Sequence, residues 1–161
     1  MGRSVVTVRI RPPSEVVYAG IERHAWSNEP SWEPEVLHVE PLAAGPIRLG
    51  ARVRMTRRDF GSAHDTTYEV TRLDPPRGLA VRHVDGPLDF ALDFTLAGVG
   101  SRETDVTVTV DIAPRGAMRL LTPVFALSAR GRNRRIANQM VAAIEAATAA
   151  AQPSGSVATA S

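Results

Sequence analysis

The sequence predicts an α+β domain in which a curved antiparallel sheet is covered by a long C-terminal helix. Two observations support this fold class. Residues 35–112 read as a series of strands separated by short turn signals, whereas residues 117–150 are rich in Ala, Leu, Arg and Met without strand-like alternation. Short connections favour antiparallel neighbours, and one long helix across the sheet is the simplest way to bury its apolar face.

Each element has its own local signal. Residues 4–10 alternate and are rich in β-branched side chains, which predicts the first strand. A Pro-Pro pair ends this strand, and Ser14 is a suitable N-cap for a short helix. A second short helical segment is expected between His24 and Pro34. Six further strands are predicted at residues 35–42, 51–59, 65–73, 78–84, 87–97 and 102–113.

The last two predicted strands alternate most clearly between apolar and polar residues. Because side chains in a strand point to opposite faces in turn, each of these strands has one apolar face. The apolar faces are formed by Phe90, Leu92, Phe94, Leu96, Val106, Val108, Val110 and Ile112.

The predicted C-terminal helix either begins near Ala117 and bends at Pro123, or begins with Thr122 as its N-cap. Its middle, residues 128–135, is polar and small, so a helix crossing the sheet there leaves space beneath it. Its second half carries an apolar stripe at helical spacing, formed by Ile136, Met140, Ala143, Ile144 and Ala147.

The length of 161 residues and the net charge of +2 suit one domain, which we place at residues 1–150, followed by a disordered tail at 151–161. All 19 basic residues are arginine, and the chain contains no cysteine. Lysine-dependent phosphate loops and Schiff bases are therefore excluded, as are thiol nucleophiles, disulfides and cysteine-based zinc sites. The sequence shows neither a secretory signal nor an apolar run long enough to span a membrane, so we expect a cytoplasmic protein.

The order of elements and the residues at their joints resemble the START/Bet v 1-like superfamily, also called SRPBCC. More narrowly, the chain resembles bacterial polyketide cyclase/dehydrase-type proteins. The resemblance covers residues 4 to about 147. It rests on the segments Ile10–Val17, Trp32–Val36, Gly45–Pro46 with Leu49–Arg52, Glu69–Leu79, and Pro114–Gly116 with Arg119–Pro123.

The resemblance implies a helix-grip fold, in which seven antiparallel strands curl around the C-terminal helix and two short helices follow the first strand. It also implies an elongated apolar cavity between sheet and helix. Strand parity and the approach to the helix predict its lining, although the same residue types also fill an ordinary core. The expected ligand-binding residues are Trp32, Val53, Met55, Tyr68, Val81, His83, Phe90, Phe94, Val108, Met118, Leu121, Phe125 and Arg132.

Two polar members of this set are candidates for chemistry. Tyr68 could donate a hydrogen bond to a ligand carbonyl or enol, and His83 could act as an acid or base near neutral pH. The alternative for Tyr68 is a packed ring with its hydroxyl at the surface. The alternative for His83 is a satisfied or rim-exposed histidine near Asp85.

We expect no cofactor and no metal. The four histidines lack the spacing of a ligand cluster, and neither a Gly-x-Ser-x-Gly elbow nor a Gly-x-Gly-x-x-Gly loop is present. Nucleic-acid or anionic-membrane binding is not expected from the arginines. Those near Arg52 and Arg54 should pair with strand acids such as Glu69, and those at residues 130–135 are spread around the helix.

The leading hypothesis is a binder or carrier of a small hydrophobic molecule such as a lipid, polyketide or isoprenoid-like compound, acting as a monomer or homodimer. The first alternative is a polyketide cyclase or dehydratase that uses Tyr68 and His83 as acid and base, with an arginine stabilising an enolate. The second is a regulatory protein that acts through its surface.

Overall fold

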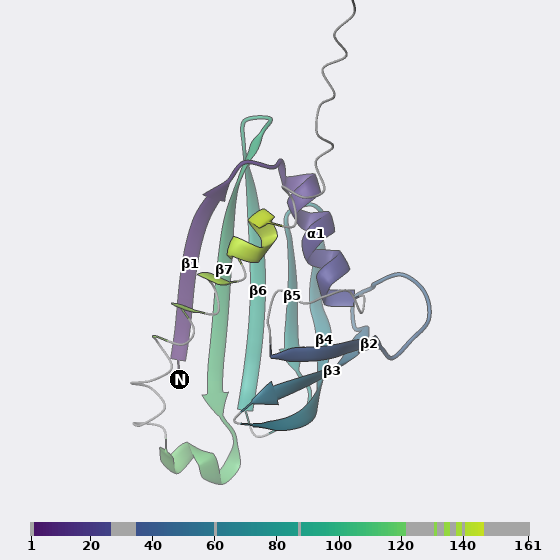
Figure 1. Cartoon of the computed structure of the whole chain (residues 1–161), viewed down its shortest axis with the longest axis vertical. Coiled ribbons are helices and arrows are strands. Elements are labelled where there is room, and N and C mark those ends of the chain that lie inside the picture. The colour runs from purple at the N-terminus through teal and green to yellow at the C-terminus, as the bar shows by residue number, and fades with distance from the viewer. Residues whose placement is uncertain are drawn as a thin grey trace, which may run out of the picture.

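The computed structural model describes residues 2–26, 35–59, 61–86, 88–121, 131, 134–135, 138–139 and 141–146. They form a curved seven-stranded antiparallel sheet in the order β1-β7-β6-β5-β4-β3-β2, with α1 across one face (Figure 1), which confirms the predicted sheet. We call the face that packs against α1 the inner face and the opposite one the outer face. The elements are β1 (Gly2–Ile10), α1 (Ser14–Trp26), β2 (Val36–Pro41), β3 (Arg52–Asp59), β4 (Ser62–Asp74), β5 (Gly78–His83), β6 (Leu88–Val99), β7 (Glu103–Pro114) and the 3-10 helix η1 (Gly116–Leu121).

β6 and β7 are paired along their whole length, from Leu88 opposite Pro114 to Val99 opposite Glu103. β6 therefore runs two residues further into the predicted turn than the sequence suggested, to Val99 instead of residue 97. The chain reverses at residues 100–102, where Gly100 takes a φ of 63°, in the left-handed region that favours glycine. The predicted alternation is confirmed, because these strands contribute much of the buried core. That core consists of Ile10, Val17, Tyr18, Ile21, Leu79, Leu92, Phe94, Leu96, Val106, Val108, Val110, Val141 and Ile144.

α1 is longer than the short helix predicted from the sequence and runs for 13 residues to Trp26. The helix continues because apolar residues recur every four positions, at Val17, Ile21 and Ala25, and all three pack against the core. Its start is held against β7, where the buried Thr104 hydroxyl donates a hydrogen bond to the Pro12 carbonyl at 2.8 Å. The second predicted helical segment overlaps the end of α1, and its residues 27–34 lie outside the described part of the chain.

The predicted C-terminal helix is seen only in part. Residues 116–121 form η1, a 3-10 helix rather than the first turns of an α-helix. Residues 131, 134–135, 138–139 and 141–146 are helical. Ile144 of the predicted stripe packs into the core, as does Val141, which was not predicted as part of that stripe. The remainder of residues 122–161, including the expected tail, lies outside the described residues. Among the helices that the structure describes, none has the length and apolar composition needed to cross a bilayer.

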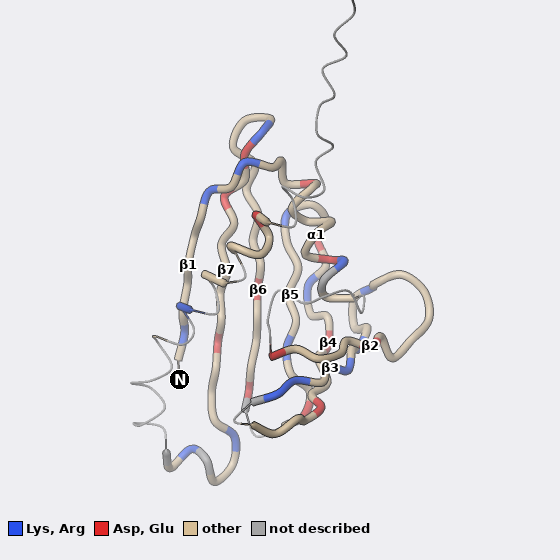
Figure 2. Tube along the Cα trace, in the orientation of Figure 1, with Lys and Arg blue, Asp and Glu red and all other residues tan. Residues whose placement is uncertain are grey.

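Ion pairs link charged side chains on neighbouring strands of the outer face. Figure 2 shows charged residues spread along the strands rather than gathered in one place. At one end, Arg9 of β1 binds Asp105 of β7 at 2.8 Å. Hydrogen bonding to this guanidinium holds the pKa of the Asp105 carboxyl below its usual value. Arg9 is exposed and Asp105 is half-buried, and a pair this close to solvent contributes little to the free energy of folding.

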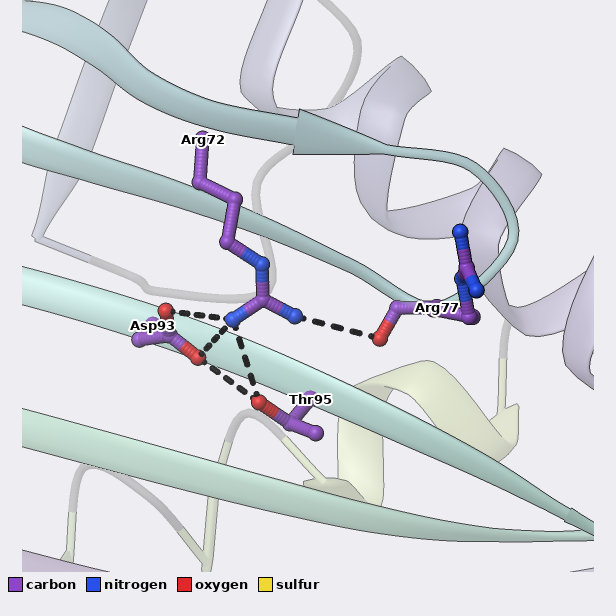
Figure 3. Close-up of polar contacts among 4 residues, drawn as sticks. All are labelled: Arg72, Arg77, Asp93 and Thr95. Atoms are coloured by element: carbon purple, nitrogen blue, oxygen red, sulfur yellow. Dashed lines mark hydrogen bonds and ion pairs between the residues drawn. The ribbon is translucent and has the colours of Figure 1, made fainter.

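A β-bulge in β4 is held by the most extensive polar network on this face. Val70 lies opposite Val81 of β5, but Arg72 lies opposite Ala80, so β4 has one extra residue at this point. The guanidinium of Arg72 crosses β5 to reach Asp93 of β6 at 2.8 and 3.0 Å (Figure 3). It also donates to the Thr95 hydroxyl and the Arg77 carbonyl, both at 3.3 Å. The network thus ties together β4, β5 and β6 where the sheet bends.

The path of Arg72 requires a glycine beneath it. A Cβ atom built on Gly78 would lie 1.8 Å from an Arg72 guanidinium nitrogen and 2.6 Å from the backbone carbonyl oxygen of Phe94. Moving Arg72 aside would still leave the contact with the backbone. Position 78 therefore excludes any side chain.

We predict that Gly78→Ala destabilises the fold by about 1–3 kcal/mol, because the added methyl group must displace both Arg72 and the strand backbone. Gly98→Ala in β6 is the matched control, since its Cβ would meet only the Ser14 hydroxyl oxygen at 3.8 Å. It should change the free energy of unfolding by less than about 0.5 kcal/mol. Urea denaturation of the two variants measures the difference, and equal stability would contradict the role assigned to Gly78.

We also predict that Tyr18 titrates with a pKa of about 12, raised from its ordinary value by burial and by the negative charge of Glu22. The folded state therefore gains stability below about pH 10, the unfolded value, and loses it as the pH rises towards 12. The chain has two tyrosines, so Tyr68→Phe leaves Tyr18 as the single phenol. Its absorbance at alkaline pH should titrate well above that of the same variant unfolded in guanidinium, and coinciding curves would refute the prediction.

Candidate ligand-binding site on the inner face

One row of inner-face side chains crosses five strands of the sheet. Val53 of β3 lies opposite Tyr68 of β4, and Tyr68 lies opposite His83 of β5. His83 contacts Phe90 of β6, which lies opposite Ile112 of β7. We call these five residues the inner-face row. They share one face because each strand alternates with period two, and the β4 bulge begins only beyond Val70.

The three rings of the row form a compact group. The ring centroids of Tyr68 and His83 are 4.4 Å apart with their planes at 78°, an edge-to-face contact. Those of His83 and Phe90 are 4.9 Å apart at 36°, and those of Tyr68 and Phe90 are 6.2 Å apart at 80°. Such geometries are favourable for aromatic pairs. The group therefore fixes the position of the histidine ring between two other rings.

The structure places both polar residues on the inner face of the sheet. Tyr68 is 7% exposed. His83 is half-buried and packs on Tyr68 and Phe90. The Asp85 carboxylate accepts a hydrogen bond from the backbone N–H of Thr67 at 2.9 Å.

The other predicted lining residues fall into three groups. Val53 is part of the row, Val81 lies on the inner face beside it, and Met55 is half-buried opposite Thr66. Phe94 and Val108 are 3% and 0% exposed within the core, where they pack rather than line open space. The third group lies outside the described part of the chain: Trp32, Phe125 and Arg132 in full, and the side chains of Met118 and Leu121.

Thr66 is a polar inner-face residue that the sequence analysis did not select. Its exposed fraction is 6%, and it lies on the same face of β4 as Tyr68 and Val70. The signal was present, because Thr66, Tyr68 and Val70 are spaced two apart. Its hydroxyl adds a third polar group to this end of the inner face.

A hollow of about 800 Å³ lies where β1 begins and β7 ends, and its lining differs from that of the predicted apolar cavity. His83, Phe90 and Ile112 contribute to it, but most of its side chains are charged and belong to the outer face. They include the predicted partner of the β3 arginines, Glu69, which binds Arg52 at 3.2 Å and Arg82 at 3.5 Å. These exposed pairs contribute little energy each.

The inner-face row provides acid–base and hydrogen-bonding groups in an apolar setting. A phenol can donate or accept a hydrogen bond, and an imidazole can gain or lose a proton near neutral pH. Within the described residues, no three His, Asp or Glu side chains are grouped so as to hold a metal ion. The arrangement is suited to orienting an oxygen atom of an otherwise apolar molecule.

Comparison with known proteins finds matches to the structure of this chain but none to its sequence. Neither the models of protein families nor the sequences of curated proteins match this chain. Solved structures do match. A START superfamily protein from Mycobacterium smegmatis has 14% sequence identity and a TM-score of 0.75 over 94% of this chain and 100% of its own. The Zhui aromatase/cyclase from a Streptomyces species has 21% identity and a TM-score of 0.56 over 71% and 69%.

Norcoclaurine synthase from Thalictrum flavum, solved in complex with dopamine and hydroxybenzaldehyde, has 10% identity and a TM-score of 0.65 over 94% of this chain and 90% of its own. Identities this low establish a shared fold and nothing finer. The chain therefore has the START/Bet v 1-like fold that its sequence resembles.

Proposed function

We propose that the protein binds a small hydrophobic molecule against the inner face of the sheet, at the inner-face row. The observation that carries this proposal is the placement of Tyr68 and His83, in ring contact, between the apolar side chains of Val53 and Phe90. Apolar burial would supply the affinity, at about 25 cal/mol per Å², and these two residues would orient the ligand.

A second candidate is the catalysis of an aldol cyclisation with loss of water on a poly-β-ketone chain. The contact of Tyr68 with His83 favours it, because the two groups can serve one substrate atom. A base such as His83 would take a proton from the carbon between two carbonyls, and that carbon would attack another carbonyl of the chain. Tyr68 would donate a hydrogen bond to the oxyanion that forms. The oxyanion would take the proton back from the His83 imidazolium, and the resulting hydroxyl would leave as water together with the second hydrogen of the attacking carbon. Solved structures of this fold include an aromatase/cyclase, which supports the comparison.

We predict that Phe90→Arg abolishes ligand binding, lowering affinity for the uncharged hydrophobic probe Nile red at least about a hundredfold, because an uncompensated charge enters an apolar site. Any organic ligand that co-purifies, detected by native mass spectrometry, should also be lost. Val5→Arg is the matched control, since Val5 lies on the outer face of β1 and is 56% exposed. Equal binding by the two variants while both remain folded would overturn the proposed site.

Tyr68→Phe and His83→Asn separate binding from catalysis. A binding protein should lose about two- to tenfold in affinity for its ligand, the effect of one hydrogen bond. An enzyme should keep most of its affinity for a poly-β-ketone thioester but lose about 10²–10⁴-fold in kcat.

The control for this pair is Tyr18→Phe, which removes the other phenol of the chain from the core beneath α1. This substitution should alter neither the affinity for the ligand nor kcat. If the wild type turns over no poly-β-ketone thioester while it binds the hydrophobic probe, the catalytic candidate is rejected and the binding proposal stands.

A further inference from the structure

The loop between β2 and β3, residues 42–50, stands out from the sheet beside the C-terminal end of α1 (Figure 1). Its sequence is Leu-Ala-Ala-Gly-Pro-Ile-Arg-Leu-Gly, so Arg48 is its single charged residue. It contains no hydroxyl, amide or carboxylate side chain, and Figure 2 draws it tan along most of its length. Exposed connections are normally rich in such polar groups, which makes this loop unusual.

The loop is held in place by hydrogen bonds at its base and near its middle. The Leu42 backbone N–H donates to the Arg52 carbonyl at 2.9 Å, which extends the β2–β3 ladder into the loop. The Trp26 indole N–H at the end of α1 donates to the Gly45 carbonyl at 3.2 Å. The loop therefore presents its side chains in a defined arrangement.

The apolar side chains of the loop divide between the core and the solvent. Ile47 is half-buried and packs against the core cluster. Leu42 is 43% exposed, Leu49 is 65% exposed, and residues 43–46 between them are exposed as well. A single exposed leucine is normal on a protein surface and needs no explanation. A projecting segment whose side chains are apolar except for one arginine is typical of an interaction site.

We propose that this loop docks the protein on an anionic lipid bilayer, with Leu42 and Leu49 entering the headgroup region and Arg48 contacting lipid phosphates. Arg48 is an exposed residue of the loop. Apolar side chains beside a basic residue are the combination that binds such interfaces. The sequence feature that indicates this surface is an apolar loop and not a cluster of arginines.

Other occupants fit the loop less well. A stable protein partner needs about 800 Å² of complementary surface on each side, which a narrow projecting loop does not offer by itself. A two-fold contact with this loop on the symmetry axis would set the loop against its own equivalent and bring two Arg48 side chains together. An anionic bilayer requires no large complementary protein surface and does not bring two Arg48 side chains together.

Docking through this loop would bring the inner face close to the membrane, because Ile47 joins the loop to the core that borders the inner-face row. The interaction does not require that a ligand be bound. Vesicle binding can therefore be tested on the protein alone, and its failure would leave the proposed ligand site untouched.

The experiment measures co-sedimentation of the full chain with vesicles of phosphatidylcholine and with vesicles of equal parts phosphatidylcholine and phosphatidylglycerol. We expect stronger binding to the anionic vesicles. Leu49→Asp should weaken that binding about tenfold, because it removes an inserting side chain and adds repulsion from the lipid. The matched control is Leu120→Asp, which alters an 85% exposed leucine in η1 and should bind as the wild type does.

Arg48→Gln tests the electrostatic contribution to vesicle binding. It should weaken binding to the anionic vesicles about fivefold and leave binding to phosphatidylcholine unchanged, whereas Arg102→Gln in the β6–β7 turn should have no effect. Circular dichroism checks folding, and Leu49→Ser serves if the aspartate variant is unstable. The proposal is overturned if the wild type ignores anionic vesicles, if Leu120→Asp is equally impaired, or if Leu49→Asp instead abolishes a dimer or a complex with another protein.

Discussion

The pairing of β6 with β7 is the constraint on which the rest of the structure depends. Twelve residues of each strand are in register, and the inner face of β7 places Val106, Val108 and Val110 completely out of solvent. Each such side chain stabilises the fold by about 1.5–3 kcal/mol through burial. α1 and the described C-terminal helical residues pack onto this face, so the helices depend on the hairpin for their position.

The bulge in β4 links this hairpin to the candidate site. Beyond the bulge, the outer face of β4 is tied to β6 by Arg72 and Asp93, and Gly78 leaves the space through which the guanidinium passes. Before the bulge, the inner face of β4 presents Tyr68 to His83. A change of register by one residue at this point would turn Tyr68 towards solvent. The structural network on one face and the aromatic group on the other are therefore held by the same strand pairing.

Much of the candidate site was accessible to local reasoning. Period-two alternation assigned Val53, Tyr68, His83 and Phe90 to one face, and the strand pairing confirms that they form a continuous row. Thr66 lies on the same face but was not predicted as a site residue, because the prediction considered apolar lining residues and acid–base groups. The length of α1 was underestimated, because its later apolar positions were not recognised as a continuation of the helix. The predicted apolar cavity would be closed by helix residues outside the described part of the chain, whereas the hollow of about 800 Å³ among the described residues is lined mainly by charged outer-face side chains.

By itself, the sequence determined the strands and their apolar faces, because alternation is a local property of the chain. It also determined that lysine and cysteine chemistry are absent. Only the tertiary structure decided that the Tyr68 and His83 rings meet at 4.4 Å, since that contact depends on the register between β4 and β5. Only the tertiary structure decided that Leu42 and Leu49 face solvent while Ile47 packs inward. Exposure within a loop without periodic structure is set by what the rest of the fold packs against it, which no local pattern records.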